Sequence, residues 1–149
     1  MRSRALVVAI AGTLLVGAAR AEWKGGTQAE VRLEGGEQSW LVRATLNGRP
    51  SGLFLLDTGA TVCVLTPELA DRARVEPTGQ DVDIQTANGV VHAPLVRIRS
   101  VEVGGNRAHD VMAVVHAGIG PSADGVIGLS FLNQFSYAID PKRRVLRLR

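Results

Sequence analysis

Short segments that alternate between apolar and polar residues dominate the chain and predict an all-β protein. They recur about every 8–12 residues with turn residues between them, which is typical of a small domain that is a closed barrel or a sandwich. The expected strands are 28–33, 39–46, 53–56, 61–65, 81–86, 90–93, 95–103, 110–115, 125–127, 137–140 and 145–148. The segment 95–103 alternates most cleanly, so we expect its odd and even residues to lie on opposite faces.

Turn and helix signals divide these strands. Asn47-Gly48 and Asn88-Gly89 each lie between two strand segments, and this dipeptide is the strongest short hairpin signal. A short helix is expected at Pro67–Ala73, with Thr66 as its N-cap and Pro67 at its first position. A second is expected at 128–135, because Leu129, Leu132 and Phe135 share one helical face.

The N-terminus has the pattern of a secretory signal peptide. Arg2 and Arg4 precede an apolar stretch of 15 residues, 5–19, and Ala19-Arg20-Ala21 fits a small-x-small cleavage site. Residues 1–21 are therefore predicted to be a signal peptide, and an uncleaved membrane anchor is the alternative. The stretch is shorter than the roughly 20 residues that a spanning helix needs. Removal of 21 of the 149 residues leaves one domain, 22–149, that is exported to the periplasm or secreted.

Cleavage also changes the charge. The whole chain has 17 Lys and Arg and 14 Asp and Glu, but three of the arginines lie in the first 21 residues. The mature chain is therefore balanced, and its charge gives no reason to expect nucleic acid as a partner. Basic residues crowd the C-terminus, at Lys142, Arg143, Arg144, Arg147 and Arg149. We interpret them as the charges of a solvated edge strand, with contact to an anionic surface as the alternative.

The single cysteine and the three histidines indicate no cofactor. Cys63 lies between Val62 and Val64 and is expected to be a small buried hydrophobe, although an intermolecular disulfide or a redox switch is an alternative. The histidines lack metal-ligand spacing, so no metal site is predicted. Ser130 lacks the nucleophile-elbow pattern.

The candidate chemistry lies in Asp57-Thr58-Gly59-Ala60, which follows the apolar run 53–56. A buried strand would deliver one carboxylate into a tight turn, where Gly59 permits unusual φ angles and close backbone approach. Peptide hydrolysis by carboxylates needs two of them sharing one proton, since like charges about 3 Å apart cannot both ionise. One carboxylate accepts a proton from water while the other polarises the scissile carbonyl.

A second copy of the motif is missing from the sequence. Asp124-Gly125 lacks the intervening hydroxyl residue, and neither Asp110 nor Asp140 lies in a glycine turn. A homodimer, in which two Asp57 carboxylates meet at the two-fold axis, is the simplest way to complete the pair. The tripeptide alone also occurs by chance, so the motif by itself leaves a purely structural turn equally open.

The residues around the motif resemble the retropepsin-like aspartic proteases. The match consists of 53–61, which is similar to the family's active-site strand, and Gly125-Val126-Ile127-Gly128-Leu129, which is similar to its second signature before the C-terminal helix. The bacterial exported members of the clan are the most similar. The resemblance implies a small closed β barrel of the acid-protease type with one or two short helices.

The resemblance also implies roles for individual residues. Asp57 would be the catalytic carboxylate, Thr58 would lock the two active-site loops together, and Gly59 would support the carboxylate network. Ala60 would contact substrate, as would the flap tip Ala87-Asn88-Gly89. The strand at 145–148 would lie where the family forms its dimer.

The predicted function is therefore an exported, homodimeric aspartic endopeptidase that hydrolyses peptide bonds. Its partners would be a peptide or protein substrate and a second copy of the chain, with no membrane contact after signal cleavage and no cofactor. The alternative is a catalytically silent dimer of the same fold that binds peptides or acts in assembly. Retention of Asp57, Thr58 and Gly59 favours the enzyme.

Overall fold

The computed structural model describes residues 29–36, 39–86 and 88–149. The predicted signal peptide at 1–21, the start of the first expected strand and the flap-tip residue Ala87 lie outside these ranges. Within the described ranges, no helix is both long enough and apolar enough to cross a membrane.

Ten strands and two short helices make up the described chain. In chain order they are β1 (Ala29–Arg32), β2 (Leu41–Leu46), β3 (Ser51–Leu56), β4 (Cys63–Leu65), α1 (Pro67–Ala73), β5 (Glu76–Thr86), β6 (Gly89–Val103), β7 (Asn106–Val115), β8 (Gly125–Ile127), α2 (Leu129–Leu132), β9 (Tyr137–Asp140) and β10 (Val145–Leu148). The all-β prediction is confirmed, and so is the cap of α1, where the Thr66 side chain accepts a hydrogen bond from the Leu69 amide.

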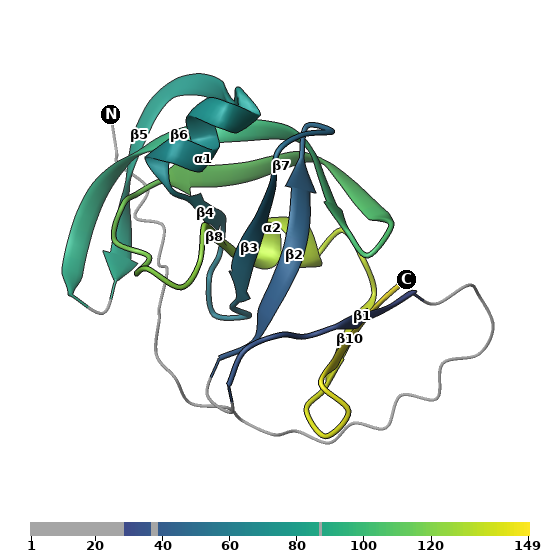
Figure 1. Ribbon diagram of the computed structural model, residues 1–149. Coiled ribbons are helices and arrows are strands. Elements are labelled where there is room, and N and C mark those ends of the chain that lie inside the picture. The colour runs from purple at the N-terminus through teal and green to yellow at the C-terminus, as the bar shows by residue number, and fades with distance from the viewer. Residues whose placement is uncertain (1–28, 37–38, 87) are drawn as a thin grey trace.

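The strands β2 to β8 form one strongly curved sheet in the order β2-β3-β8-β4-β7-β6-β5. An additional pairing of β2 with β6 closes six of these strands into a barrel of the retropepsin-like type. The remaining strand, β5, pairs only with β6 and forms a long hairpin with it (Figure 1). Two pairings, β3 with β8 and β4 with β7, are parallel. They bring segments distant in the sequence beside the end of β3.

Two apolar clusters stabilise this arrangement. The larger one fills the barrel and reaches the terminal strands, with Phe54, Phe131 and Leu146 fully buried. The smaller one lies between the β5–β6 hairpin and the barrel and includes Ile84 and Ala93. Burial of such side chains contributes roughly 1.5–3 kcal/mol each. The half of the hairpin nearer its tip is therefore packed onto the barrel.

The terminal strands form a separate three-stranded sheet in the order β1-β10-β9 (Figure 1). Because β10 is the central strand, the expectation that the basic C-terminus is a solvated edge strand is wrong. Its arginines pair with acids: Arg143 and Arg147 both bind Glu30, at 2.9 and 3.1 Å. The Arg143 hydrogen bonds, and after them those of Arg147, lower the pKa of Glu30.

Several expected strands are longer or more irregular in the structure. The segments 90–93 and 95–103 are one strand, β6, that continues through Pro94. Proline is tolerated because β6 pairs only with β5 at that point, and pairing with β7 begins at Leu95. The helix α2 ends at Leu132, short of Phe135, and β5 and β7 begin earlier than expected.

The strict alternation expected for 95–103 is also wrong. Val96 and Ile98 are buried, and so are Val101 and Val103, so the inward face changes from even to odd residues. The ladder between β6 and β7 is interrupted opposite Asp110, which has a φ of 51°. The neighbours Arg99 and Ser100 therefore both remain outside the core.

Candidate active site

Asp57 directly follows β3 and stands at the start of a tight turn. Its main-chain amide donates to the Ile127 carbonyl at 3.0 Å, which extends the parallel pairing of β3 and β8 by one residue. The Gly59 amide donates to Asp57 Oδ1 at 2.8 Å. The turn therefore fixes one carboxylate oxygen by a backbone donor, as the glycine in the motif predicts.

The other side of the motif faces solvent. Thr58 and Gly59 are exposed and Asp57 is partly exposed. Among the described residues, Asp57 Oδ2 and the Thr58 hydroxyl have no hydrogen-bond partner. Both groups are thus available to a substrate, to water or to a second chain.

The turn is held from below by the segment that links β8 to α2. The Leu129 amide donates to the Ala60 carbonyl at 2.8 Å, and the Ser130 amide donates to the Thr61 carbonyl at 3.1 Å. Gly128 makes this close approach possible, since a Cβ atom there would lie 2.6 Å from the Ala60 oxygen. The two sequence signatures are therefore in direct contact.

Two polar side chains that sequence reasoning did not assign hold this scaffold together. Asp124 Oδ2 accepts a hydrogen bond from the Leu53 amide at 2.8 Å. Ser130 Oγ donates to the Met112 carbonyl at 2.7 Å and accepts from the Cys63 amide at 3.0 Å. A carboxylate before a buried strand and a hydroxyl at a helix start are weak signals, because their partners are distant in the sequence.

Cys63 is buried beneath the turn, as expected. Its sulfur accepts from the Gly128 amide at 3.5 Å, and burial raises the pKa of its thiol. A raised pKa keeps the thiol protonated and unreactive. Burial thus favours the structural interpretation over an intermolecular disulfide or redox switch.

The β5–β6 hairpin covers the same side of the barrel. Ala60 from the Asp57 turn is fully buried in one cluster with Ile84 and Ala93 from the hairpin strands. At the tip, Asn88 is exposed and its amide donates to the Thr86 hydroxyl, which in turn donates to the Gly89 carbonyl. The half of the hairpin nearer its tip therefore packs in the same cluster as Ala60.

Among the residues that the structure describes, no group of three or more His, Cys, Asp or Glu side chains could hold a metal ion. The Asp57 turn supplies one carboxylate and backbone donors.

Comparison with known proteins identifies the family. The family model described as aspartyl protease matches residues 42–131, which run from β2 to the middle of α2 and include both Asp57 and Gly128. The chain belongs to the aspartyl protease family. The family and the fold together support a peptidase.

A solved structure gives the same fold. The crystal structure of a retropepsin-like aspartic protease from Rickettsia conorii matches with a TM-score of 0.58 and 20% sequence identity, over 82% of this chain and 90% of that one. No curated protein matches the sequence. The terminal strands β1, β9 and β10 of this aspartyl protease lie outside the segment that the family model covers.

Proposed function

We propose that the protein is an aspartic endopeptidase whose catalytic pair consists of Asp57 from each of two copies. The observation that carries the proposal is the state of the Asp57 carboxylate. One oxygen is fixed by the Gly59 amide at 2.8 Å, and the other has no partner among the described residues. A fixed carboxylate with one free oxygen suits a group that must share a proton with a second carboxylate.

The chemistry follows from that pair. A water molecule between the carboxylates would give a proton to the ionised one, and its oxygen would attack the carbonyl carbon of the peptide. The protonated carboxylate would donate to the carbonyl oxygen. The tetrahedral intermediate then breaks at the C–N bond, and the leaving amine takes the proton that the first carboxylate had accepted. No covalent intermediate with the enzyme is formed.

The substrate would be an extended peptide between the Asp57 turn and the β5–β6 hairpin. Support comes from the hairpin's packing against Ala60 and from its exposed tip at Asn88. Closure of such a hairpin excludes water from the reacting bond. Strand-like pairing with the peptide backbone would give affinity with little dependence on sequence.

A second copy would complete the site. Thr58 is exposed with its hydroxyl free in the described chain, and in the dimer it would bond to the partner's turn. The terminal sheet limits how a dimer forms, because β10 is paired on both sides by β1 and β9. Strand pairing through this terminal sheet would therefore use the outer edge of β1 or β9.

The protein would act outside the cytoplasm. The proposal rests on the signal-peptide pattern of residues 1–21, with 22–149 as the protease domain. N-terminal sequencing of the exported protein would test the boundary. A mature chain that begins near Glu22 is expected.

The activity is tested with Asp57→Asn. The asparagine keeps an oxygen for the Gly59 amide, so the fold should be retained, but it cannot accept or share a proton. Cleavage of a diverse peptide mixture, followed by mass spectrometry from acidic to neutral pH, should fall by about 10²–10⁴-fold or more. Asp71→Asn is the matched control, since Asp71 is an exposed carboxylate on α1. Wild-type rates in Asp57→Asn would refute the proposal.

A further inference from the structure

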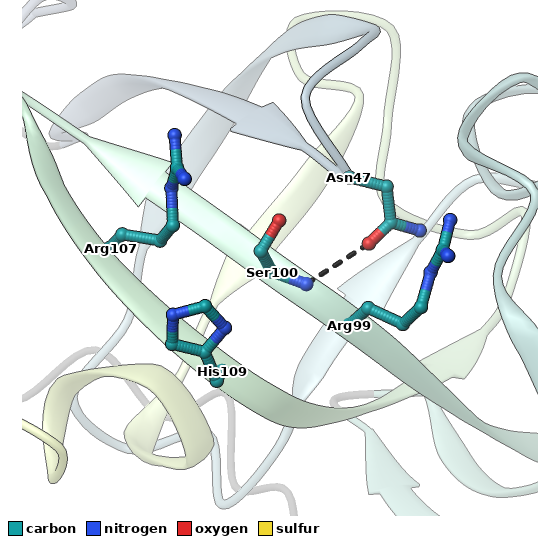
Figure 2. Close-up of a pocket in the computed structure, with 5 residues that line it drawn as sticks. All are labelled: Asn47, Arg99, Ser100, Arg107 and His109. Atoms are coloured by element: carbon teal, nitrogen blue, oxygen red, sulfur yellow. Dashed lines mark hydrogen bonds between the residues drawn. The ribbon is translucent and has the colours of Figure 1, made fainter.

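An open pocket lies at the end of the barrel remote from Asp57. Its volume is about 320 Å³, and it is lined by Asn47, Arg99, Ser100, Arg107 and His109 (Figure 2). Asn47 belongs to the turn that precedes β3, whereas Asp57 follows it. Because six strand residues span about 20 Å, the pocket is separate from the candidate active site.

The interrupted ladder between β6 and β7 creates this pocket. Regular pleating would direct Arg99 and Ser100 to opposite faces, yet both line the same pocket. The change of phase opposite Asp110 explains how two consecutive residues do so. The irregularity thus gathers polar side chains from both strands on one surface.

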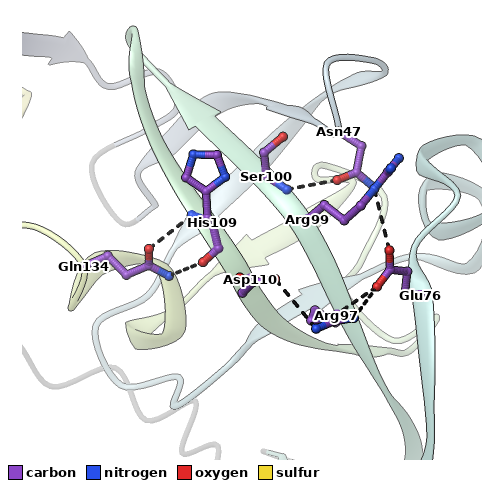
Figure 3. A network of polar contacts seen from close by, with 8 residues as sticks. All are labelled: Asn47, Glu76, Arg97, Arg99, Ser100, His109, Asp110 and Gln134. Carbon is purple, nitrogen blue, oxygen red and sulfur yellow. Dashed lines mark hydrogen bonds and ion pairs between the residues drawn. The ribbon is translucent and has the colours of Figure 1, made fainter.

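The frame of the pocket is fixed by hydrogen bonds. Asn47 accepts from the Ser100 amide at 3.0 Å and donates to the Ala73 carbonyl at 2.9 Å, which ties together the β2–β3 turn, β6 and α1. On the opposite wall, the Gln134 side chain bonds both the amide and the carbonyl of His109, at 3.2 and 2.8 Å (Figure 3). The lining residues therefore stand on a preorganised backbone.

The pocket offers many donors and has no carboxylate in its lining. The Arg99 side chain makes no hydrogen bond within the described residues, and its ion pair with Glu76 is long, at 3.7 Å (Figure 3). Glu76 is instead held closely by Arg97, at 2.6 Å. The Ser100 hydroxyl and the His109 ring are also without hydrogen-bond partners in the described part of the chain.

Arg107 is only partly engaged. Its Nε and Nη2 atoms bind one oxygen of Glu102, at 3.1 and 2.6 Å. A guanidinium has five N–H donors, and Nη1 makes no hydrogen bond within the described residues. Two arginines, a hydroxyl and an imidazole thus surround a space that has no carboxylate in its lining.

We propose that this pocket binds an anion rich in oxygen atoms, a carboxylate or phosphate compound. Planar guanidinium groups match the oxygens of both groups, and such charge-assisted hydrogen bonds are stronger than neutral ones. Because the neighbouring acids Glu76 and Glu102 balance much of the local charge, recognition depends on the free donors of Arg99 and Ser100. The pocket therefore selects an anion by the positions of its acceptor oxygens more than by its charge alone.

The test is an NMR titration of the ¹⁵N-labelled full chain with inorganic phosphate and, separately, with citrate, at constant ionic strength. At least one anion should bind saturably and shift the amides of Ser100 and His109. Arg99→Gln should weaken binding by about tenfold, as expected for the loss of charge-assisted hydrogen bonds. Arg43→Gln is the matched control, since Arg43 is an exposed arginine that pairs only at 3.6 Å with Glu34 among described residues.

The outcomes distinguish carboxylate binding from phosphate binding, and the pocket from the candidate active site at Asp57. Tighter binding of phosphate or of citrate identifies the preferred group, and Asp57→Asn should bind with wild-type affinity even if the chain proves to have no protease activity. Arg99→Lys should bind more weakly than wild type, because it keeps the charge but loses the planar fork. The absence of saturable shifts with both anions, or full affinity in a folded Arg99→Gln variant, would overturn the proposal.

Discussion

The carbonyl oxygen of Ala60 lies so close to Gly128 that a Cβ atom on that glycine would be only 2.6 Å from it. The same atom would be 2.6 Å from the Val62 carbonyl oxygen. Both neighbours are backbone atoms, and the Ala60 carbonyl already accepts the Leu129 amide. The Asp57 turn therefore depends on the absence of a side chain at Gly128.

Gly128→Ala should consequently destabilise the protein. The added methyl group must displace backbone, and overpacking of this kind typically costs about 1–3 kcal/mol. Urea denaturation would measure the loss as a lower midpoint with an unchanged slope. Gly36→Ala is the control, since a Cβ atom there would meet nothing within 4 Å and φ is not in the left-handed region. Equal midpoints for the two variants would contradict the close contact.

Asp124 provides a second test of the scaffold. Its Oδ2 atom accepts the Leu53 amide in β3, and its own amide donates to the Leu53 carbonyl. Asp124→Ala leaves the Leu53 amide without its partner, which should cost roughly 1–3 kcal/mol. Asp124→Asn keeps an acceptor and should lose less. Thermal unfolding would rank the three proteins, and an alanine variant as stable as the asparagine variant would exclude the role.

The local elements could largely be predicted from the sequence. Thr66 and Pro67 begin α1 because capping and a fixed φ act within a few residues, and Asn47-Gly48 forms the hairpin because both residues adopt positive φ. The barrel type followed from the resemblance around Asp57 and Gly128. These features depend on short stretches of chain, which sequence patterns describe well.

Pairing between strands that are distant in the sequence is harder to predict. The central position of β10 depends on β1, which is more than 100 residues earlier in the chain, so the expectation of an edge strand there is wrong. The role of Ser130 depends on its hydrogen bonds with Met112 and Cys63. The pocket near Ser100 depends on the interrupted ladder between β6 and β7, which no local sequence motif predicts. Such contacts arise only when the sheet closes.

The stability of the β5–β6 hairpin should depend on pH through the protonation of His92. The ring lies 2.8 Å from Asp83 and 3.6 Å from Asp81, and the hydrogen bond with Asp83 is the main cause that raises the pKa of His92. A raised pKa means that the folded hairpin favours protonated histidine. The stabilisation is therefore full below the unfolded value of about 6.5 and is lost as pH rises through the folded pKa.

Hydrogen-exchange protection factors of the hairpin amides, measured from roughly pH 5 to pH 8, should fall with rising pH. His92→Gln should remove this dependence. His109→Gln is the control and should retain it, because the His109 ring has no ion-pair partner in the described chain. An NMR titration in which His92 behaves as a free histidine would contradict the mechanism.

The proposed shared site makes a quantitative prediction for mixtures of wild type and Asp57→Asn. If each active site needs Asp57 from both copies, a mixed dimer is inactive. With equal amounts and random exchange, only about one quarter of the dimers are fully wild type, so activity should be one quarter of that of wild type at the same total concentration. Independent monomers would give one half. Mixing must allow subunits to exchange, which sedimentation of the diluted proteins would establish. Because Thr58 is exposed and unbonded within the described chain, Thr58→Val should also weaken the dimer while leaving the monomer fold intact. A linear dependence of activity on the wild-type fraction would show that one Asp57 is sufficient and would reject the two-fold site.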